Sequence, residues 1–135
     1  MAANALADTG FIVALLNRRD NCHSWAVSQA SEFRPPWYTC EAVISEAVHL
    51  LGPHGLAQLA ELLNRRALVV SFQLDQELKP VLALMTKYGS VPMGLADACL
   101  VRMTETIADS VVLTIDTDFR IYRRHSRQIV PSIMP

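Results

Sequence analysis

Residues 110–119 read SVVLTIDTDF, an apolar run that stops at two aspartates, Asp116 and Asp118. A short run of β-branched and apolar residues bounded by polar ones is typical of a buried strand. The preceding residues 95–107 place small and apolar side chains at helical spacing, and Asp97 opens this segment. A helix followed by a buried strand is the unit from which parallel α/β sheets are built.

The rest of the chain repeats this alternation. Further strands are expected at NALAD (4–8), WYT (37–39), ALVVSF (67–72) and QIVPSI (128–133), the last as an edge strand terminated by Pro131. Helices are expected over residues 11–18, 22–33, 40–51, 54–66, 74–88 and 118–125. Thr39 is placed to cap helix 40–51, Gly52 and Pro53 should end it, and Pro80 predicts a kink or a late helix start. We predict one α/β domain over residues 1–135, with a mostly parallel sheet.

Length and composition fit one ordinary globular domain. The 135 residues are 51% hydrophobic and carry a formal net charge of −1, so any nucleic-acid binding must come from a local basic patch. The three cysteines, Cys22, Cys40 and Cys99, show no paired spacing, which suits a reducing compartment. The sequence contains neither a membrane-spanning apolar stretch nor a signal peptide, so we expect a cytoplasmic protein with no membrane partner.

Acidic residues recur where a strand gives way to a helix. Asp8 follows the first expected strand, Asp97 opens a helix, and Asp116 with Asp118 follows another strand. Each has a structural alternative, as a helix cap, a first-turn carboxylate or a turn residue. Glu46 lies among the apolar residues of EAVISEAVHLL, so we expect it to be buried. A buried carboxylate is rare unless it is paired or binds a metal.

These acids are expected to meet, because the carboxyl ends of parallel strands share one edge of the sheet. Two carboxylates about 5 Å apart repel by about 3 kcal/mol at an effective dielectric constant of roughly 20. Such a cluster requires protonation or a cation, and oxygen ligands favour Mg²⁺ or Mn²⁺. The sequence therefore predicts a metal site suited to phosphate chemistry, since a bound metal can activate water as a nucleophile.

Four segments, taken in order, resemble the motifs of the PIN-domain ribonucleases, the family of the VapC-type toxins of bacterial toxin–antitoxin pairs. They are ADTGFIVALLN (7–17), ISEAVHLL (44–51), LADACLVRM (95–103) and LTIDTDF (113–119). Their order and spacing agree over nearly the whole chain. The resemblance implies a three-layer α/β/α fold whose central, mostly parallel sheet has five strands. One departure is Gly10, where a serine or a bulkier residue is also common.

The resemblance also implies roles for single residues. The acidic quartet of the family corresponds here to Asp8, Glu46, Asp97 and Asp116. The resemblance implies supporting roles for an auxiliary acid, Asp118, and for two hydroxyl residues, Thr9 and Thr114. Our mechanistic hypothesis is that the three aspartates of this quartet hold Mg²⁺ or Mn²⁺ and that Glu46 helps or binds a second ion. Glu46 is also the candidate for positioning or deprotonating the attacking water, because we expect its helix to desolvate it. The implied activity is metal-dependent cleavage of single-stranded or structured RNA. Family members commonly form homodimers, and a small antitoxin protein is the implied partner.

A local basic patch follows the last acids. Arg120, Arg123, Arg124 and Arg127 recur at spacings of three and four residues, so one helical face could present them to RNA phosphates. The alternative is a solvated helix face that offsets the nearby acids. Tyr122 lies within the patch and could either stack on a base or belong to the core.

Other functions are less consistent with the sequence. A phosphoryl-accepting receiver domain needs a lysine after a late strand, where this chain offers arginines, and a dehalogenase-type phosphatase needs paired aspartates after its first strand. Neither a zinc-site spacing of histidines and cysteines nor a Walker-type phosphate loop is present. The remaining alternative is a catalytically silent PIN-like module that binds RNA or a protein. Retention of all four acids argues against it.

Overall fold

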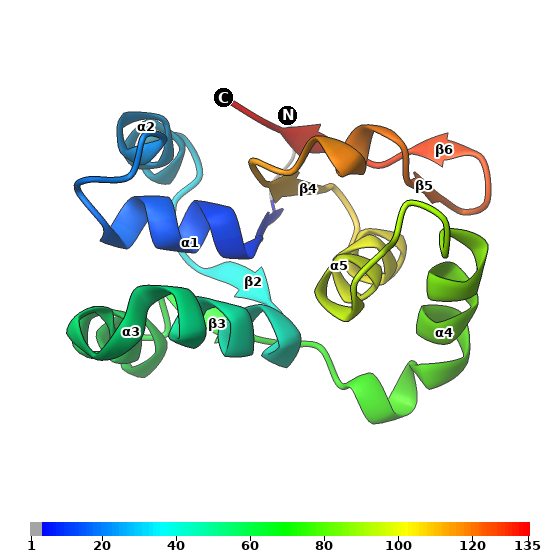
Figure 1. Ribbon diagram of the computed structural model, residues 1–135, viewed down its shortest axis with the longest axis horizontal. Coiled ribbons are helices and arrows are strands. Elements are labelled where there is room, and N and C mark those ends of the chain that lie inside the picture. The colour runs from blue at the N-terminus through cyan, green and yellow to red at the C-terminus, as the bar shows by residue number, and fades with distance from the viewer. Residues whose placement is uncertain (1–3) are drawn as a thin grey trace.

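Residues 4–135, which the computed structural model describes, form a central sheet with helices on both sides (Figure 1). The sheet has five strands in the order β3-β2-β1-β4-β7, and every neighbouring pair is parallel. Its strands are β1 (Asn4–Ala7), β2 (Trp37–Thr39), β3 (Leu68–Val70), β4 (Ser110–Leu113) and β7 (Ser132–Ile133). The predicted α/β fold with a five-stranded parallel sheet is confirmed.

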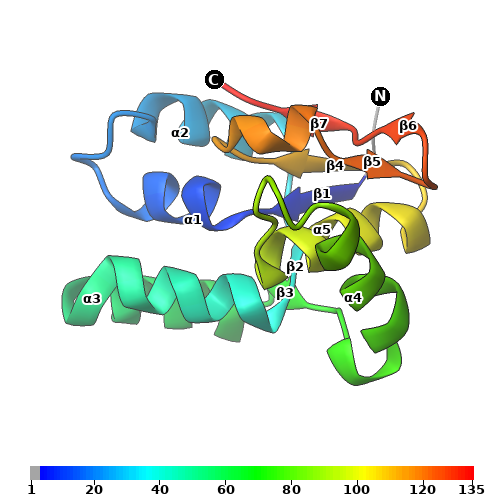
Figure 2. The same ribbon diagram turned by 45° about the vertical axis from the view of Figure 1, so that its right-hand side comes forward.

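The helices lie in two groups. They are α1 (Thr9–Leu16), α2 (His23–Glu32), α3 (Glu41–Asn64), α4 (Leu78–Lys87) and α5 (Leu95–Thr106), with short 3-10 helices η1 (Leu74–Gln76) and η2 (Thr117–Arg120). Figures 1 and 2 show α1, α2 and α3 together on one side of the strands and α4 with α5 on the other. This arrangement buries both faces of the sheet, as expected for parallel strands.

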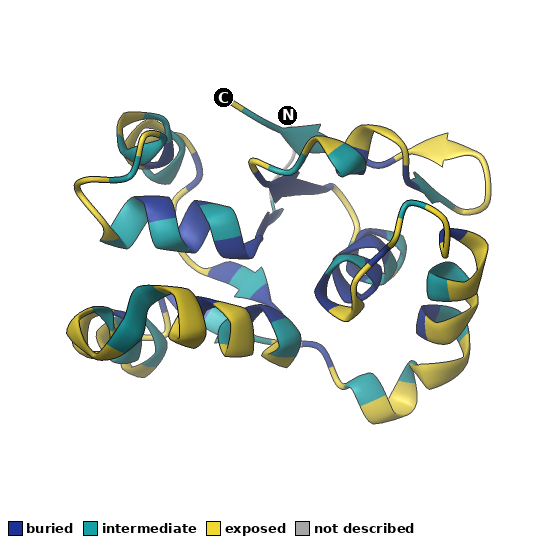
Figure 3. Ribbon diagram, in the orientation of Figure 1, coloured by how far each residue is buried: buried dark blue, intermediate teal, exposed yellow. Residues whose placement is uncertain are grey.

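The core lies between the central strands and the helices α1 and α5. Figure 3 shows buried residues concentrated on these two helices and on β4, whereas α3 and α4 turn many residues to solvent. Phe11 packs edge-on against two tryptophans, with ring centroids 6.0 Å from Trp25 and 5.6 Å from Trp37. Each fully buried large side chain contributes about 1.5–3 kcal/mol through the hydrophobic effect. This packing fixes the start of α1, which carries the first acid of the quartet.

Helix α3 is interrupted at Gly52, where we expected the first of two helices to end, and consists of two helical segments joined by a kink. Gly52 has φ 65° and ψ −171°, and the helix continues beyond it to Asn64. Glycine adopts positive φ without a Cβ clash, and Pro53 can begin the second segment because its missing N–H needs no helical partner there. The predicted capping role of Thr39 is wrong. The Thr39 hydroxyl is buried and donates to the Ala7 carbonyl at 2.8 Å, so Cys40 occupies the N-cap position.

The late helix start expected from Pro80 is observed. Helix α4 begins at Leu78, which places Pro80 in the first turn, where its lack of an N–H costs nothing. The preceding residues Leu74–Gln76 form a separate 3-10 turn. The predicted helix over 74–88 is therefore two elements.

The C-terminal prediction was wrong in two places. The expected helix 118–125 is replaced by η2 and by β5 (Arg123–Arg124), which pairs antiparallel with β6 (Gln128–Ile129). The expected edge strand 128–133 is divided at Pro131, and only the part after Pro131 joins the main sheet as β7. The Pro131 carbonyl nevertheless accepts a hydrogen bond from the Val112 N–H at 2.9 Å, because proline lacks only the donor.

Candidate active site

The register of β1 and β4 brings Asp8 beside Thr114. Ala7 pairs with Leu113, so the next residue of each strand emerges at the same carboxyl edge of the sheet. The Thr114 hydroxyl donates to Asp8 Oδ2 at 2.6 Å, and the Thr9 N–H donates to Asp8 Oδ1 at 2.7 Å. Both Asp8 and Thr114 are buried. Asp8 thus caps α1 through the adjacent Thr9 N–H, and its second oxygen is held by Thr114, which is distant in sequence.

The loop after β4 places Asp116 next to this pair. The Asp116 N–H donates to Thr114 Oγ1 at 2.9 Å, so one hydroxyl links two acids of the quartet. Asp116 Oδ1 in turn accepts from the Asp118 N–H at 2.9 Å and caps η2. Asp116 therefore does cap a helix, which was the structural alternative for this residue. The capping hydrogen bond occupies only one of its two carboxylate oxygens.

Asp97 reaches the same edge from the first turn of α5. Its Oδ2 accepts from the Gly94 N–H at 3.1 Å and from the Tyr122 hydroxyl at 3.2 Å. Tyr122 is fully buried between Phe119, 5.3 Å away between ring centroids, and Tyr88, 5.2 Å away. Tyr122 is therefore a core residue that also orients Asp97, and it has no free face on which a base could stack.

Glu46 joins the group from α3, but it is exposed, which contradicts our expectation of a buried carboxylate. The apolar residues around it do not enclose it, because Val48 and Leu50 are themselves 41% and 62% exposed. The Thr9 hydroxyl donates to Glu46 Oε2 at 2.8 Å and so ties α3 to the residue that follows Asp8. Both predicted supporting hydroxyl residues thus bond to an acid of the quartet.

The charges of these acids act on one another. Burial raises the pKa of Asp8 to about 6, against the hydrogen bonds from Thr114 and the Thr9 backbone, and the charges of Asp97 and Asp116 raise it further. The pKa of Asp97 is also raised, first by burial and then by the charges of Asp116 and Glu46. Residues at positions 8, 46, 97 and 116 therefore share one electrostatic neighbourhood.

The donor set at this edge suits a hard divalent cation. It consists of carboxylate and hydroxyl oxygens, which are the ligands that Mg²⁺ and Mn²⁺ accept in proteins. A bound cation would also stabilise the charged carboxylates and so lower the pKa values of Asp8 and Asp97, which burial and neighbouring charges raise. Within residues 4–135, the structure contains no group of three or more His, Cys, Asp or Glu side chains arranged to hold a metal ion.

The predicted arginine face does not form, because the chain leaves the helical conformation after Arg120, the last residue of η2, and Arg123 and Arg124 belong to strand β5. Arg123 Nη1 donates to the carbonyls of Arg120, Ile121 and Tyr122 at 2.8, 3.1 and 2.9 Å, and so stabilises the turn after η2. Arg124 Nη1 donates to the Thr104 carbonyl at 3.1 Å. The exposed side chain of Arg120 lies closest in sequence to the acids. RNA binding by these arginines stays a prediction.

Sequence reasoning missed one constraint at this site, the contact between Gly10 and Ile115. A Cβ added to Gly10 would lie 2.4 Å from Ile115 Cγ1 and 2.8 Å from its Cδ1. Ile115 connects Thr114 to Asp116, so this close approach sets how near the start of α1 comes to the loop after β4. The absence of a side chain at Gly10, noted as a departure from the family pattern, was the available signal.

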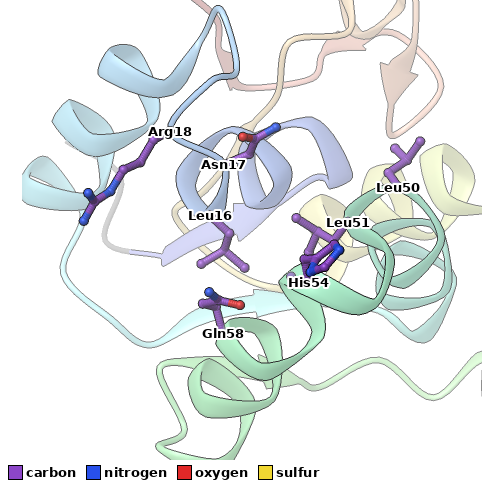
Figure 4. Close-up of a pocket in the computed structure, with 8 residues that line it drawn as sticks. Leu16, Asn17, Arg18, Leu50, Leu51, His54 and Gln58 are labelled. Carbon is purple, nitrogen blue, oxygen red and sulfur yellow. The ribbon is translucent and has the colours of Figure 1, made fainter.

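A separate cavity of about 230 Å³ lies between the end of α1 and the bend of α3 (Figure 4). Leu16 and Leu51 are among its lining residues, and Arg18 extends away from His54 and Gln58 in that view. The residues of the described chain that line this cavity include none of the four acids. We therefore do not include it in the candidate active site.

The parallel sheet and its flanking helices define an α/β domain with acidic residues gathered at the carboxyl edge of its strands. The sequence matches the family model of the PIN domain over residues 5–124, and the chain belongs to the PIN-domain family. PIN domains are generally nucleases, and PIN nucleases generally use divalent metal ions. A comparison with curated proteins gives no match. In the part of the chain that the structure describes, every helix is too short or too polar to cross a membrane.

Proposed function

We propose that this protein is a Mg²⁺- or Mn²⁺-dependent endoribonuclease that cleaves single-stranded or structured RNA. The observation that carries the proposal is the convergence of Asp8, Glu46, Asp97 and Asp116 at the carboxyl edge of the sheet. The Thr114 hydroxyl bonds to Asp8 and to the Asp116 N–H, Thr9 bonds to Asp8 and to Glu46, and the charges of Asp116 and Glu46 act on Asp97. Family membership supports hydrolysis of nucleic acid in general. The choice of RNA rests on the resemblance to the ribonucleases of this family.

The aspartates have distinct roles in this proposal. Asp8, Asp97 and Asp116 would hold the ion, with Asp118 as an auxiliary ligand. The bound ion supplies charge neutralisation at the scissile phosphate and lowers the pKa of the attacking water. Thr114 orients Asp8 through its 2.6 Å hydrogen bond, and Tyr122 orients Asp97.

Glu46 is suited to accept a proton from the attacking water. It is exposed, so substrate and water can reach it, and the Thr9 hydroxyl fixes one of its oxygens at 2.8 Å. Its second oxygen remains available to a water molecule. Arg120 would meet a flanking phosphate of the RNA.

The proposed biological role is that of a toxin in a toxin–antitoxin pair, acting in the cytoplasm. The three cysteines of the chain are free, which suits a reducing compartment. A small antitoxin protein and a second copy of the chain are the proposed partners.

The variant Asp97→Asn tests the nuclease proposal. Loss of one ligand charge should lower metal-dependent cleavage of a single-stranded RNA by roughly 100-fold or more, at a melting temperature no lower than that of the wild type. Asp75→Asn, which alters an exposed aspartate of η1, is the matched control and should cleave like the wild type. Chelation of divalent ions should abolish cleavage by both the wild type and the control.

Two results would count against the proposal. Cleavage by Asp97→Asn at the wild-type rate would contradict the assignment of the acids. Tight RNA binding by the wild type without any cleavage in Mg²⁺ or Mn²⁺ would favour the catalytically silent module instead.

A further inference from the structure

A cavity of about 510 Å³ adjoins the acid cluster. It lies between the first turns of α3 and α5 and the segment that follows β3, and Glu46 belongs both to its wall and to the acidic quartet. Ala96, which precedes Asp97, also lines it. An RNA strand whose phosphate lies at the acids would therefore place a neighbouring nucleotide over this cavity. Its volume falls within the usual range for small-molecule sites.

The lining of the cavity suits a base better than a phosphate. Its apolar surface comes from Phe72, Leu74 and Leu95 together with small residues of α3 and α5. Its charged lining residues are two glutamates, Glu41 and Glu46, and the described residues that line it include no lysine, arginine or histidine. A phosphate would be repelled by these carboxylates, whereas the apolar faces of an uncharged base would be buried.

Glu41 gives the cavity a preference among bases. It is exposed and lies in the first turn of α3, and it is not among the residues that bond to the acid cluster. An ionised carboxylate only accepts hydrogen bonds. Guanine presents two adjacent donors on its Watson–Crick edge, its ring N–H and its amino group, which match the two oxygens of one carboxylate. Uracil presents a single donor between two carbonyl oxygens, and these would face the carboxylate unfavourably.

We infer that this cavity binds the base next to the scissile phosphate and that Glu41 selects guanine over uracil there. The inference rests on the proposed ribonuclease function and adds a specificity residue to it. A well-placed bidentate contact between a side chain and a base provides discrimination of about 1–3 kcal/mol, which corresponds to roughly 5- to 150-fold.

The test compares single-stranded RNA substrates that differ only in the base next to the cleaved bond. The ratio of kcat/KM for guanine over uracil is measured for the wild type, for Glu41→Gln and for Glu61→Gln. Glu61 lies on the same helix, far from the cavity, and its side chain is 67% exposed, so it is the matched control. We expect the ratio to fall by roughly tenfold in Glu41→Gln and to be unchanged in Glu61→Gln.

A binding measurement separates this inference from the nuclease proposal. The same RNAs are titrated against Asp97→Asn and against Asp97→Asn combined with Glu41→Gln, and affinity is followed by fluorescence anisotropy. Preferential binding of the guanine RNA that is lost with Glu41 supports base selection even if the wild type does not cleave. The inference would be overturned if the guanine-to-uracil ratio were the same with and without the Glu41→Gln substitution. It would also be overturned if Glu61→Gln lowered that ratio as much as Glu41→Gln does.

Discussion

The central residue of the site is Asp8, whose carboxylate is buried yet held by two donors. The Thr114 hydroxyl and the Thr9 N–H stabilise its charged form, but burial and the neighbouring charges outweigh them and leave its pKa at about 6. Close to neutral pH, this carboxylate can therefore exchange a proton for a metal ion with little cost. The Thr114 hydroxyl is the donor whose removal should have the largest effect, because it also receives the Asp116 N–H.

Thr114→Val should shift the pH dependence of cleavage. The hydroxyl lowers the pKa of Asp8, so its loss raises that pKa, and the acid limb of the pH–rate profile should move to higher pH. We expect activity at pH 7 to fall by about tenfold, the usual effect of losing a hydrogen bond to a charged group. Thr106→Val, at an exposed position at the end of α5, is the control. An unshifted acid limb would show that Thr114 does not act on Asp8.

At this scale the sequence predicted which acids meet but not how they are held. The meeting of Asp8 and Asp116 follows from two features, the position of β1 beside β4 and the parallel register that pairs Ala7 with Leu113. The exposure of Glu46 could not be predicted, because an apolar stretch of helix implies burial only if another element covers it. The bond from Tyr122 to Asp97 joins residues 25 positions apart across a buried aromatic cluster, and no local spacing signals it.

Among the elements, the contact of α1 with the loop after β4 is the least tolerant of change. Gly10 allows Ile115 to lie directly over the first turn of α1, between Thr114 and Asp116. A side chain at Gly10 would push Ile115, and with it the adjoining aspartate, away from Asp8.

Gly10→Ala should therefore lower cleavage by about tenfold, and Ile115→Ala should restore much of the loss when the two are combined, because the second change removes the clashing atoms. The readouts are kcat/KM of the two single variants and of the double variant. Gly89→Ala is the control, since a Cβ there would meet only backbone oxygens at 3.5 and 3.7 Å, which is ordinary contact. Strictly additive losses in the double variant would show that the two positions do not interact.

The C-terminal elements mark the limit of helical periodicity as a predictor. The arginines after Asp118 recur at helical spacing, but the tertiary burial of Tyr122 and the positive φ values of His125 and Ser126, 47° and 70°, turn the chain into a hairpin. Arg123 bonds to backbone carbonyls that a helix would have satisfied internally. Tertiary contacts therefore outweighed a local pattern that carried no apolar face to support it.

For the whole molecule, the acid cluster should make stability depend on pH and on metal ions. The pKa of Asp8 is higher in the folded state, about 6, than its ordinary value of 3.8. The folded protein therefore binds this proton more tightly, and its contribution to stability is present below pH 3.8 and is lost as pH rises towards 6. A shift of this size corresponds to about 3 kcal/mol.

We predict that Asp8→Asn is more stable than the wild type at pH 7.5 without divalent ions and that the difference disappears near pH 4. Addition of Mg²⁺ at pH 7.5 should raise the melting temperature of the wild type but not that of Asp8→Asn, because the ion binds the folded protein through this carboxylate. Thermal unfolding at both pH values, with and without Mg²⁺, measures this. Equal stabilisation of both proteins by Mg²⁺ would place the ion elsewhere.

The alternation of strands and helices along the chain was the most predictable feature of the fold. Alternating strands and helices allow few arrangements once crossovers must be right-handed and the strands parallel, so the sheet and its acidic edge follow from the pattern. The termination of a strand at Pro131 was predicted, but the return of the chain to the main sheet after Pro131 was not, because a proline can end one strand and still accept a hydrogen bond next to another.

The most direct test is a crystal structure of the protein soaked in Mn²⁺, read from the anomalous signal of the metal. We predict a peak at the carboxyl edge of the sheet that contacts Asp8, Asp97 and Asp116 directly or through water, and its loss in Asp97→Asn crystals. Mn²⁺ bound only at other places, with these carboxylates still free of metal at saturating concentration, would contradict the central claim.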